Sequence, residues 1–253
     1  MNIGGLAAIV TGGASGLGAA TAEHLSRAGA KVAIFDLNAD VGNKIAQRLG
    51  GRFHKVNVAD DLSVTNGVVA AEAAHGVARI LVNCAGVAPA IRVVAKDGTA
   101  HPLDDFRKAV EVNLIGSFNA IARFAAHLIA AKIEGEEAGV IVNTASAAAY
   151  DGQIGQAAYA ASKGGVVAMT LPIARDLAQH RIRVMTIAPG IFLTPMLMGL
   201  PQAAQDSLGL QVPHPARLGQ PGEYAQLVES IIANPMLNGE VIRLDGAVRM
   251  APR

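Results

Sequence analysis

The chain has 253 residues, of which 51% are hydrophobic and 16% charged, so it can bury a full core and is not a disordered protein. Its formal charge of +1, without a Lys/Arg cluster, gives no indication of a nucleic-acid partner. A single cysteine, Cys84, excludes an internal disulfide framework and a multi-cysteine metal site, and we expect no bound metal.

Short apolar runs alternate with longer amphipathic stretches along the chain, a rhythm that predicts a parallel sheet with helices on both faces. The predicted strands are Leu6–Thr11, Lys31–Asp36, Arg52–Val56, Ile80–Asn83, Val140–Thr144, Arg183–Ile187 and Glu240–Leu244. The predicted helices are Gly18–Ala28, Ala39–Leu49, Leu62–Ala74, Leu103–Ala131, Ala157–His180 and Pro221–Ala233. We therefore expect one Rossmann-type, doubly wound α/β domain over 1–253 with about seven strands, its cofactor half at about 1–145 and its catalytic and substrate half at about 146–253.

Two segments interrupt this rhythm, Val87–Pro102 and Ile191–Gly219. Both are rich in Pro and Gly, and both follow the carboxyl end of a predicted strand. Ligands of open α/β sheets bind at that edge, so we interpret the two segments as substrate-facing loops. Surface decoration is the alternative interpretation.

A glycine-rich stretch, Thr11-Gly12-Gly13-Ala14-Ser15-Gly16-Leu17-Gly18, joins the first strand to the first helix. Gly12, Gly16 and Gly18 give the spacing G-x-x-x-G-x-G, one residue looser than the usual dinucleotide fingerprint. Glycines at such a turn allow the backbone to approach a pyrophosphate at a helix N-terminus. A glycine-rich turn alone is weak evidence, since many such turns only connect a strand to a helix.

Asp36 strengthens the dinucleotide interpretation. It ends the second predicted strand, twenty residues after Gly16, where a carboxylate can accept hydrogen bonds from the adenosine ribose hydroxyls. The same carboxylate would repel a 2′-phosphate, and Leu37 and Asn38 follow it instead of Arg or Lys. The sequence therefore favours NAD over NADP as cofactor.

Tyr159 and Lys163 lie four residues apart in a predicted helix, so both side chains project from one face. A nearby ammonium favours the phenolate, and we expect Lys163 to lower the pKa of Tyr159 towards neutrality, as a general acid/base requires. Lys163 can also hold the nicotinamide ribose. Taken alone, this spacing occurs by chance on many helices.

Ser146 and Asn113 complete a candidate catalytic set. Ser146 follows the strand Val140–Thr144, and its hydroxyl can hydrogen-bond the substrate oxygen beside Tyr159. Asn113 lies in a helical stretch where asparagine is mildly disfavoured, which indicates a local backbone or water contact. A strand-end capping serine and a solvated helix asparagine are the alternative interpretations.

These motifs together resemble the short-chain dehydrogenase/reductase family. The resemblance covers essentially the whole chain and is carried by T-G-G-x-S-G-L-G, Asn83-Cys84-Ala85-Gly86, Asn113, Ser146, Tyr159-x-x-x-Lys163 and Pro189-Gly190. It implies that Asn113, Ser146, Tyr159 and Lys163 form the catalytic tetrad. It also implies that Asn83, Ala85 and Gly86 line the riboses, and that the segment after Pro189-Gly190 holds the carboxamide.

The resemblance narrows to the type-2 3-hydroxyacyl-CoA dehydrogenases, through GQAAYAASKGGVVAMTLPIARDLA, IRVMTIAPGIFLTP, LNGEVIRLDGAVRM and the loop Val87–Pro102. That subgroup implies NAD as cofactor, a homotetramer, and a short-chain acyl-CoA substrate, with looser activity on steroids and alcohols. It implies further NAD contacts from Ser15, Leu17, Asp36, Val58, Cys84, Phe192 and Thr194, and places Gln153 near the substrate.

Two positions depart from the family pattern. Asn57-Val58 stands where the third strand usually ends in Asp-Val, with the Asp facing the adenine amino group. Asn57 keeps a carbonyl acceptor, so adenine binding should survive. Cys84 stands where the wider family often has Asn, and we interpret it as a small packing residue beside the cofactor.

We therefore expect an NAD-dependent enzyme of fatty acid metabolism that interconverts a short 3-hydroxyacyl-CoA and its ketone. A steroid or general alcohol dehydrogenase is one alternative, because it shares the fold and the tetrad. An acyl-carrier-protein ketoreductase is another, but such enzymes generally prefer NADPH, which Asp36 disfavours. A dinucleotide-binding scaffold subunit is the alternative from another class. The single cysteine and the absence of a recognisable leader predict a cytoplasmic location, without a membrane partner.

Overall fold

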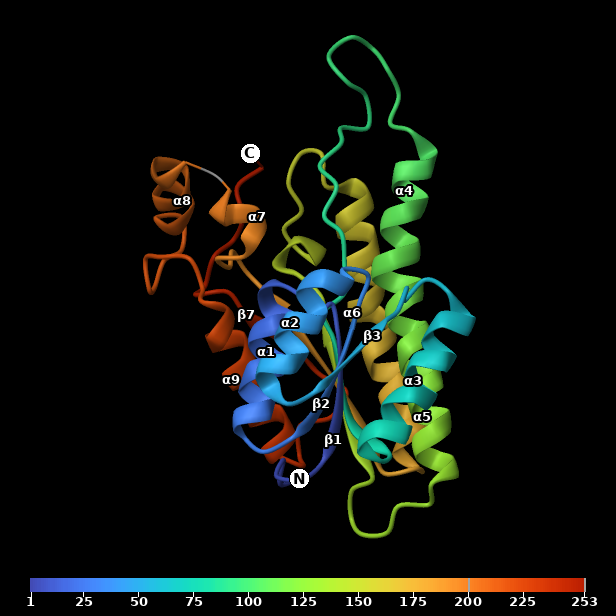
Figure 1. Ribbon diagram of the computed structural model, residues 1–253. Helices are drawn as coiled ribbons and strands as arrows, with labels where there is room; N and C mark the ends of the chain where they lie inside the picture. The colour runs from blue at the N-terminus through green and yellow to red at the C-terminus, as the bar shows by residue number, and fades with distance from the viewer. Residues whose placement is uncertain (200, 253) are drawn as a thin grey trace.

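The computed structural model describes residues 1–199 and 201–252, in which seven parallel strands form one sheet in the order β3-β2-β1-β4-β5-β6-β7 (Figure 1). The strands are β1 (Ala7–Thr11), β2 (Lys31–Asp36), β3 (Arg52–Lys55), β4 (Ala78–Asn83), β5 (Gly139–Thr144), β6 (Ile182–Pro189) and β7 (Val241–Leu244). The predicted doubly wound α/β fold is thus confirmed.

The central strands are nearly all apolar because helices cover both of their faces. All residues of β1, β5 and β6 are buried. This explains why these strands appear in the sequence as continuous hydrophobic runs, without the alternation of a half-exposed strand.

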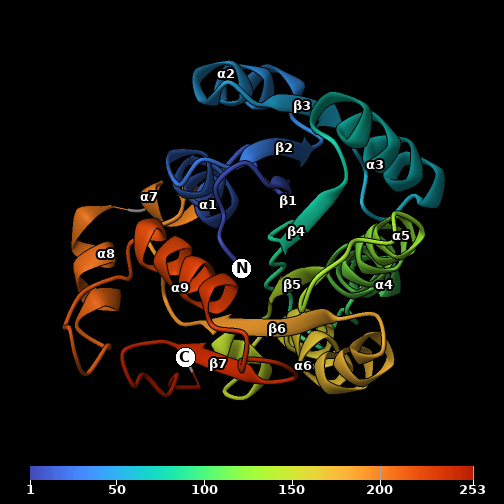
Figure 2. The ribbon, with the colours of Figure 1, turned by 90° about the horizontal axis from the view of Figure 1, so that it is seen from below.

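Two helical layers enclose the sheet (Figure 2). One layer consists of α1 (Gly16–Arg27), α2 (Ala39–Leu49) and α9 (Pro221–Ala233), which pack on the core cluster that contains Leu25, Ala46 and Val228. The other layer consists of α3 (Asp61–His75), α4 (Leu103–Val110), α5 (Gly116–Ala130) and α6 (Ala157–Ala178). Phe124 of α5 belongs to the second core cluster, which lies under that layer.

Local capping fixes where several helices begin. The Asn38 side chain accepts a hydrogen bond from Val41 N at 3.1 Å at the start of α2. The Asp60 side chain accepts a hydrogen bond from Ser63 N at 2.8 Å at the start of α3. Pro221 occupies the first turn of α9, a position where its missing N–H costs nothing.

The long helix predicted over Leu103–Ala131 is interrupted, because Glu111–Ile115 forms a π-helical turn (η1) between α4 and α5. A π turn inserts one residue into the helical register, which hydrophobic periodicity does not reveal. The span Leu103–Ala130 is also long and apolar enough to cross a membrane by length and composition alone. Its apolar character has a structural reason, since Ile121, Phe124 and Leu128 are buried in the core.

The segment predicted as a loop after β6 in fact contains two short helices, α7 (Pro195–Met198) and α8 (Gln202–Gly209). They are too short to give a clear periodic signal. A 3₁₀ turn, η2 (Ala147–Ala149), follows Ser146 and was also not predicted. The loop Val87–Pro102 extends above α4 in Figure 1, with an isolated bridge between Val94 and Ala100.

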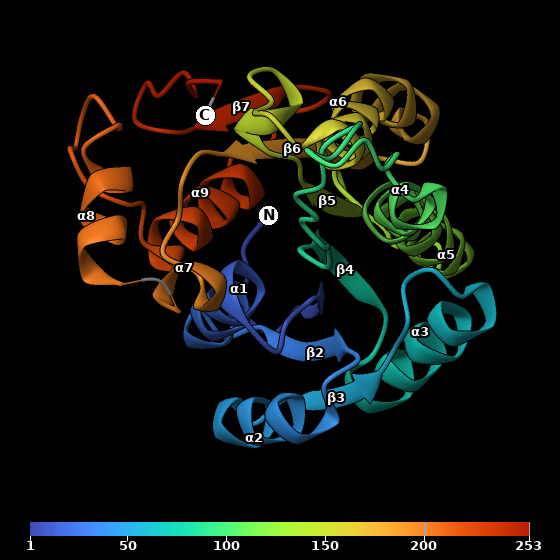
Figure 3. The same cartoon turned by 90° about the horizontal axis from the view of Figure 1, so that it is seen from above.

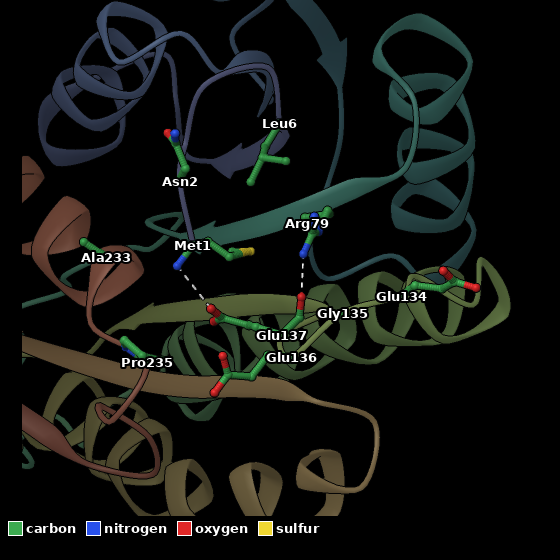
Figure 4. Close-up of a pocket in the computed structure, with 10 residues that line it drawn as sticks. All are labelled: Met1, Asn2, Leu6, Arg79, Glu134, Gly135, Glu136, Glu137, Ala233 and Pro235. Atoms are coloured by element: carbon green, nitrogen blue, oxygen red, sulfur yellow. Dashed lines mark hydrogen bonds and ion pairs between the residues drawn. The ribbon is translucent and has the colours of Figure 1, made fainter.

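The amino ends of β1, β4 and β5 border a surface cavity of about 630 Å³ (Figure 4). Several of the polar groups around it pair with one another. Glu137 accepts from the Met1 amino group at 3.2 Å and from Arg183 Nε at 2.6 Å, and Arg79 donates to the carbonyl oxygens of Glu137 and Ala138. This end of the sheet holds the fold together and contains none of the predicted site residues.

Arg183 is the centre of that arrangement. Its guanidinium is buried and also donates to the carbonyl oxygens of Ile231, Ile232 and Leu237, so it ties β6 to the end of α9. We predict that Arg183→Met lowers the free energy of unfolding by about 3–5 kcal/mol, because Glu137 loses its buried partner. Urea denaturation followed by circular dichroism measures the loss. The exposed Arg175 is the control, and Arg175→Met should change stability by less than about 0.5 kcal/mol; equal effects would contradict this role.

Candidate active site

The predicted site residues lie mostly at or just after the carboxyl ends of the parallel strands, as Asp36 does at the end of β2 and Asn83 at the end of β4. Figure 3 shows the ribbon from this edge of the sheet. Strands β1 and β4 are neighbours in space, with Thr11 opposite Asn83, although two strands separate them in sequence. The connections leave these two strands in opposite directions, and an open α/β sheet forms its ligand crevice at such a point.

The glycine loop after β1 packs closely on the turn after β4. Gly12 has φ +65°, and a Cβ there would lie 2.6 Å from Ala85 N. A Cβ on Gly18 would lie 2.2 Å from the Gly12 carbonyl oxygen. Any side chain at Gly12 or Gly18 would push the loop away from the strand end. The fold itself therefore requires glycine at both positions, whether or not a ligand binds.

The first turn of α1 presents free backbone N–H groups, as an anion site requires. Ser15 is the N-cap residue, its side chain makes no capping hydrogen bond, and the first turn carries no acidic residue. Ser15 is exposed, and Gly16 and Leu17 are partly exposed. The positive end of a helix dipole beside a glycine loop suits a pyrophosphate, so the residues present fit a dinucleotide.

Asp36 lies beside this loop at the end of β2. One carboxylate oxygen accepts from Ala14 N at 3.0 Å, and the other accepts from Asn38 N at 3.0 Å. These contacts fix the carboxylate next to the glycine loop. Each oxygen retains a lone pair for a ribose hydroxyl.

The turn after β3 forms the outer edge of this region. Asn57 is exposed, and its side-chain oxygen accepts from Ala59 N at 3.1 Å. Val58 is buried against the start of α5, where a Cβ on Gly116 would lie 2.6 Å from its Cγ2. The Val58 carbonyl oxygen accepts from Asn119 Nδ2 at 2.9 Å, which anchors the turn.

The turn Asn83–Gly86 is held from both sides. Asn83 Nδ2 donates to Asn143 Oδ1 at 3.0 Å, and Ala85 N donates to Thr11 Oγ1 at 3.2 Å. Burial raises the pKa of the Cys84 thiol, which opposes formation of the reactive thiolate. This agrees with the interpretation of Cys84 as a packing residue.

Ser146 and Tyr159 meet at the candidate catalytic centre. Ser146 follows β5 and caps η2, and its hydroxyl lies close enough to the phenol of Tyr159 on α6 to lower the pKa of that phenol. A substrate oxygen placed beside the pair can receive a proton from one hydroxyl and a hydrogen bond from the other.

Lys163 is almost fully buried, with 4% of its surface exposed. Its ammonium donates to the Thr144 carbonyl oxygen at 2.7 Å, and burial lowers its pKa from 10.5 to about 8. A Cβ on Gly86 would lie 3.5 Å from Lys163 Nζ, so the ammonium lies next to the turn after β4. It can therefore contact a ribose seated on that turn.

The expectation that Lys163 lowers the pKa of Tyr159 is wrong for this structure. Burial raises the pKa of Tyr159 above its usual value of 10, and only the hydrogen bond with Ser146 acts in the other direction. Tyr159 is thus protonated at neutral pH, which suits a proton donor.

Asn113 lies in the π turn η1 and is fully buried. Its Nδ2 donates to the Val87 carbonyl oxygen at 2.8 Å and to Ser162 Oγ at 2.9 Å, and its Oδ1 accepts from Val87 N at 2.8 Å. The side chain thus makes the expected backbone contact, but with Val87, 26 residues away, and not with a local partner. Asn113 instead fastens the loop after β4 to α6, beside Lys163.

The segment after β6 approaches the glycine loop from the other side. Pro189 is buried, and Gly190 packs on Asp245, because a Cβ there would lie 2.8 Å from Asp245 Cβ. Thr194 lies within 3.5 Å of the position of a Cβ on Gly16. The Phe192 ring is buried in the core against Gly219.

Gln153, predicted near the substrate, is half-buried and donates through Nε2 to the Ala251 carbonyl oxygen at 2.9 Å. The structure thus ties the segment after Ser146 to the C-terminal segment. Arg243 strengthens this connection, because it pairs with Asp151 and Asp245 and lies 5.1 Å from the centre of the Tyr150 ring.

Sequence reasoning missed Arg243, Thr144 and Tyr224. Arg243 lies within LNGEVIRLDGAVRM but was given no role there, and no quoted motif contains Thr144 or Tyr224. Their partners lie 92, 19 and 80 residues away in the chain. Only the charge of Arg243 beside the apolar run of β7 could have drawn attention to it.

Comparison with known proteins gives a consistent result. The sequence model of the short chain dehydrogenase family matches residues 6–205. The chain is 51% identical to human (Homo sapiens) 3-hydroxyacyl-CoA dehydrogenase type-2, covering 98% of this chain and 97% of that protein. It is 51% identical to the protein of that name from Drosophila melanogaster, covering 96% and 97%. The crystal structure of 3-hydroxyacyl-CoA dehydrogenase type-2 from Mycobacterium avium superimposes with a TM-score of 0.92 at 41% identity, covering 98% of both chains.

Asp151 provides a test of how the segment after Ser146 is held. Its hydrogen bond with Arg243 lowers the pKa of its carboxyl group, so the pair contributes stability above the unfolded-state pKa of about 4. That stability is lost as the pH falls through the lower pKa of the folded state. We predict that Asp151→Asn lowers the free energy of unfolding by about 2 kcal/mol at pH 7. The difference from wild type should shrink below pH 4, as urea denaturation at several pH values would measure; a difference that grows in acid would contradict it.

Proposed function

We propose that this chain, an oxidoreductase that belongs to the short chain dehydrogenase family, uses NAD to interconvert a short-chain 3-hydroxyacyl-CoA and the corresponding 3-oxoacyl-CoA. The observation that carries the proposal is the placement of Ser146 beside Tyr159 and of Tyr159 one helical turn from buried Lys163, at the same sheet edge as the glycine loop and Asp36. Enzymes of this family generally use NAD or NADP.

Asp36 supports NAD as the cofactor. Its carboxylate is fixed by two backbone N–H groups next to the glycine loop, where it can accept from both adenosine ribose hydroxyls. A 2′-phosphate would bring negative charge against it, and Leu37 and Asn38 offer no compensating cation.

The dinucleotide, when bound, supplies the acceptor or donor of hydride at its nicotinamide ring. The chain supplies the proton. In the direction of ketone reduction, protonated Tyr159 donates to the substrate oxygen while Ser146 stabilises the developing charge on that oxygen. In the other direction Tyr159 accepts the alcohol proton. Lys163 binds the ribose, and Asn113 holds the loop and α6 in place around it.

Two observations support the acyl-CoA substrate. The relatives named above act as 3-hydroxyacyl-CoA dehydrogenases by name, and the match covers nearly the whole chain. The loop Val87–Pro102 stands over the carboxyl edge of β4, and Ile91 N donates to the Gly155 carbonyl oxygen at 2.8 Å. The loop therefore packs on the segment that carries Gln153 and would form one wall of the substrate site.

An exposed apolar stripe supports a homotetramer, as in the resembling subgroup. Ile115, Phe118, Ala122 and Ala126 are exposed at helical spacing along η1 and α5, and Leu171 is exposed on α6. Apolar faces on long helices are typical of subunit interfaces. We also propose a cytoplasmic location, because a single cysteine is typical of proteins in a reducing compartment.

Absorbance at the NADH band tests the proposed reaction. We expect acetoacetyl-CoA to oxidise NADH rapidly, with NADPH and a steroid ketone as much poorer partners. Tyr159→Phe should lower kcat by about 10²–10⁴-fold, because the proton donor is lost. Its NADH affinity, measured by fluorescence titration, should stay near that of wild type. Turnover with the steroid alone would move the substrate to the steroid class, and full turnover by Tyr159→Phe would exclude Tyr159 as the donor.

Asp36 gives an independent test of cofactor choice. We predict that Asp36→Ala weakens NADH binding and strengthens NADPH binding, so that the ratio of the two dissociation constants changes by about 10–100-fold. Fluorescence titration with both dinucleotides gives this ratio. Asp40→Ala, which removes an acid from the first turn of α2, is the matched control and should leave the ratio unchanged. An Asp36→Ala enzyme with the wild-type ratio would contradict the assignment.

A further inference from the structure

Tyr224, in the first turns of α9, is a buried phenol that the proposed reaction does not use. It has 0% of its surface exposed and is the largest fully buried side chain among the described residues. Burial raises its pKa well above 10, so it is a neutral hydroxyl that both donates and accepts. A buried hydroxyl requires partners, and those partners show what the residue does.

The hydrogen bonds around Tyr224 have a fixed direction. Thr144 Oγ1 donates to the Asn83 carbonyl oxygen at 2.6 Å. A hydroxyl has one hydrogen, so in the 2.7 Å contact between Thr144 and Tyr224 the phenol is the donor. Cys84 Sγ lies 3.8 Å from the Tyr224 oxygen and donates to it. Tyr224 therefore joins the last residue of β5 to the turn after β4.

Thr144 is also the residue that binds Lys163. Its carbonyl oxygen accepts from the ammonium at 2.7 Å, in an environment almost without solvent. Thr144 thus contacts Tyr224 and Asn83 through its side chain and Lys163 through its carbonyl oxygen. A displacement of Thr144 would move the ammonium and the turn Asn83–Gly86 together.

We propose that Tyr224 is a positioning residue, which fixes Thr144 and the turn Asn83–Gly86 so that Lys163 meets the ribose of the bound dinucleotide. This inference rests on the role that the proposed function gives to Lys163. Tyr224 itself touches neither substrate nor dinucleotide. It connects α9, on one face of the sheet, to Lys163 on α6, on the other face.

The test compares variants that remove one hydroxyl each. Tyr224→Phe removes the donor to Thr144, and Thr144→Val removes the acceptor while Thr144→Ser keeps it. We expect Tyr224→Phe and Thr144→Val each to raise the Kd of the preferred dinucleotide and to lower kcat by about fivefold to tenfold, the size of one buried hydrogen bond. The KM for acetoacetyl-CoA at saturating dinucleotide should not change. Thr144→Val also loses the hydrogen bond to the Asn83 carbonyl oxygen, so its effect should be at least as large as that of Tyr224→Phe. The double variant should be no worse than Thr144→Val alone, because that substitution already removes the contact with Tyr224.

Thr170→Val is the matched control. Thr170 is buried on α6 and shares a 2.6 Å hydrogen bond with Thr186, away from the glycine loop, so it loses the same kind of contact. Thr170→Val should lower Tm without changing Kd or kcat, and Thr144→Ser should resemble wild type.

A wild-type Kd and kcat in Tyr224→Phe would overturn the proposal, and so would an equal loss in Thr170→Val. Should wild type bind NADH without reducing acetoacetyl-CoA, the proposed substrate would fail, while the Kd values of the variants would still decide the role of Tyr224.

Discussion

The burial of one cation, Lys163, constrains the rest of the site. A side chain with 4% exposure must find a partner, and Lys163 finds the carbonyl oxygen at the end of β5. That contact requires α6 to lie directly over the strand end. The same placement brings Tyr159, one helical turn earlier, next to Ser146. The geometry of the catalytic centre thus follows from the need to satisfy one charge in a region of low dielectric.

The same burial also determines the electrostatics. Desolvation lowers the pKa of Lys163 to about 8 and raises the pKa of Tyr159, so both groups are shifted towards their neutral forms. The two shifts favour a protonated phenol beside an amine that titrates near neutral pH. Ser146 opposes the upward shift of the Tyr159 pKa, so the two hydroxyls influence one another.

The two ends of the sheet have different roles, one in stability and the other in ligand binding. At the amino ends, Arg183 and Glu137 satisfy one another and the last carbonyl groups of α9. At the carboxyl ends, the N–H groups of α1 and the oxygens of Asp36 retain capacity for a ligand. Polar groups that are already paired stabilise the fold, and those with capacity left are available for binding. This difference distinguishes the candidate active site from the cavity at the opposite end of the sheet.

The sequence by itself determined the order of the strands and the long helices, the glycine-rich loop and the four candidate catalytic residues. These features are local: apolar runs give strands, glycines at fixed spacing give the turn, and a spacing of four gives one helical face for Tyr159 and Lys163. Only the tertiary structure decided the π turn that holds Asn113, the helices α7 and α8, the protonation of Tyr159 and the contacts of Tyr224. The reason is that burial and hydrogen bonding depend on partners distant in the chain: Thr144 and Tyr224 are 80 residues apart, and no spacing in the sequence predicts that their hydroxyls meet.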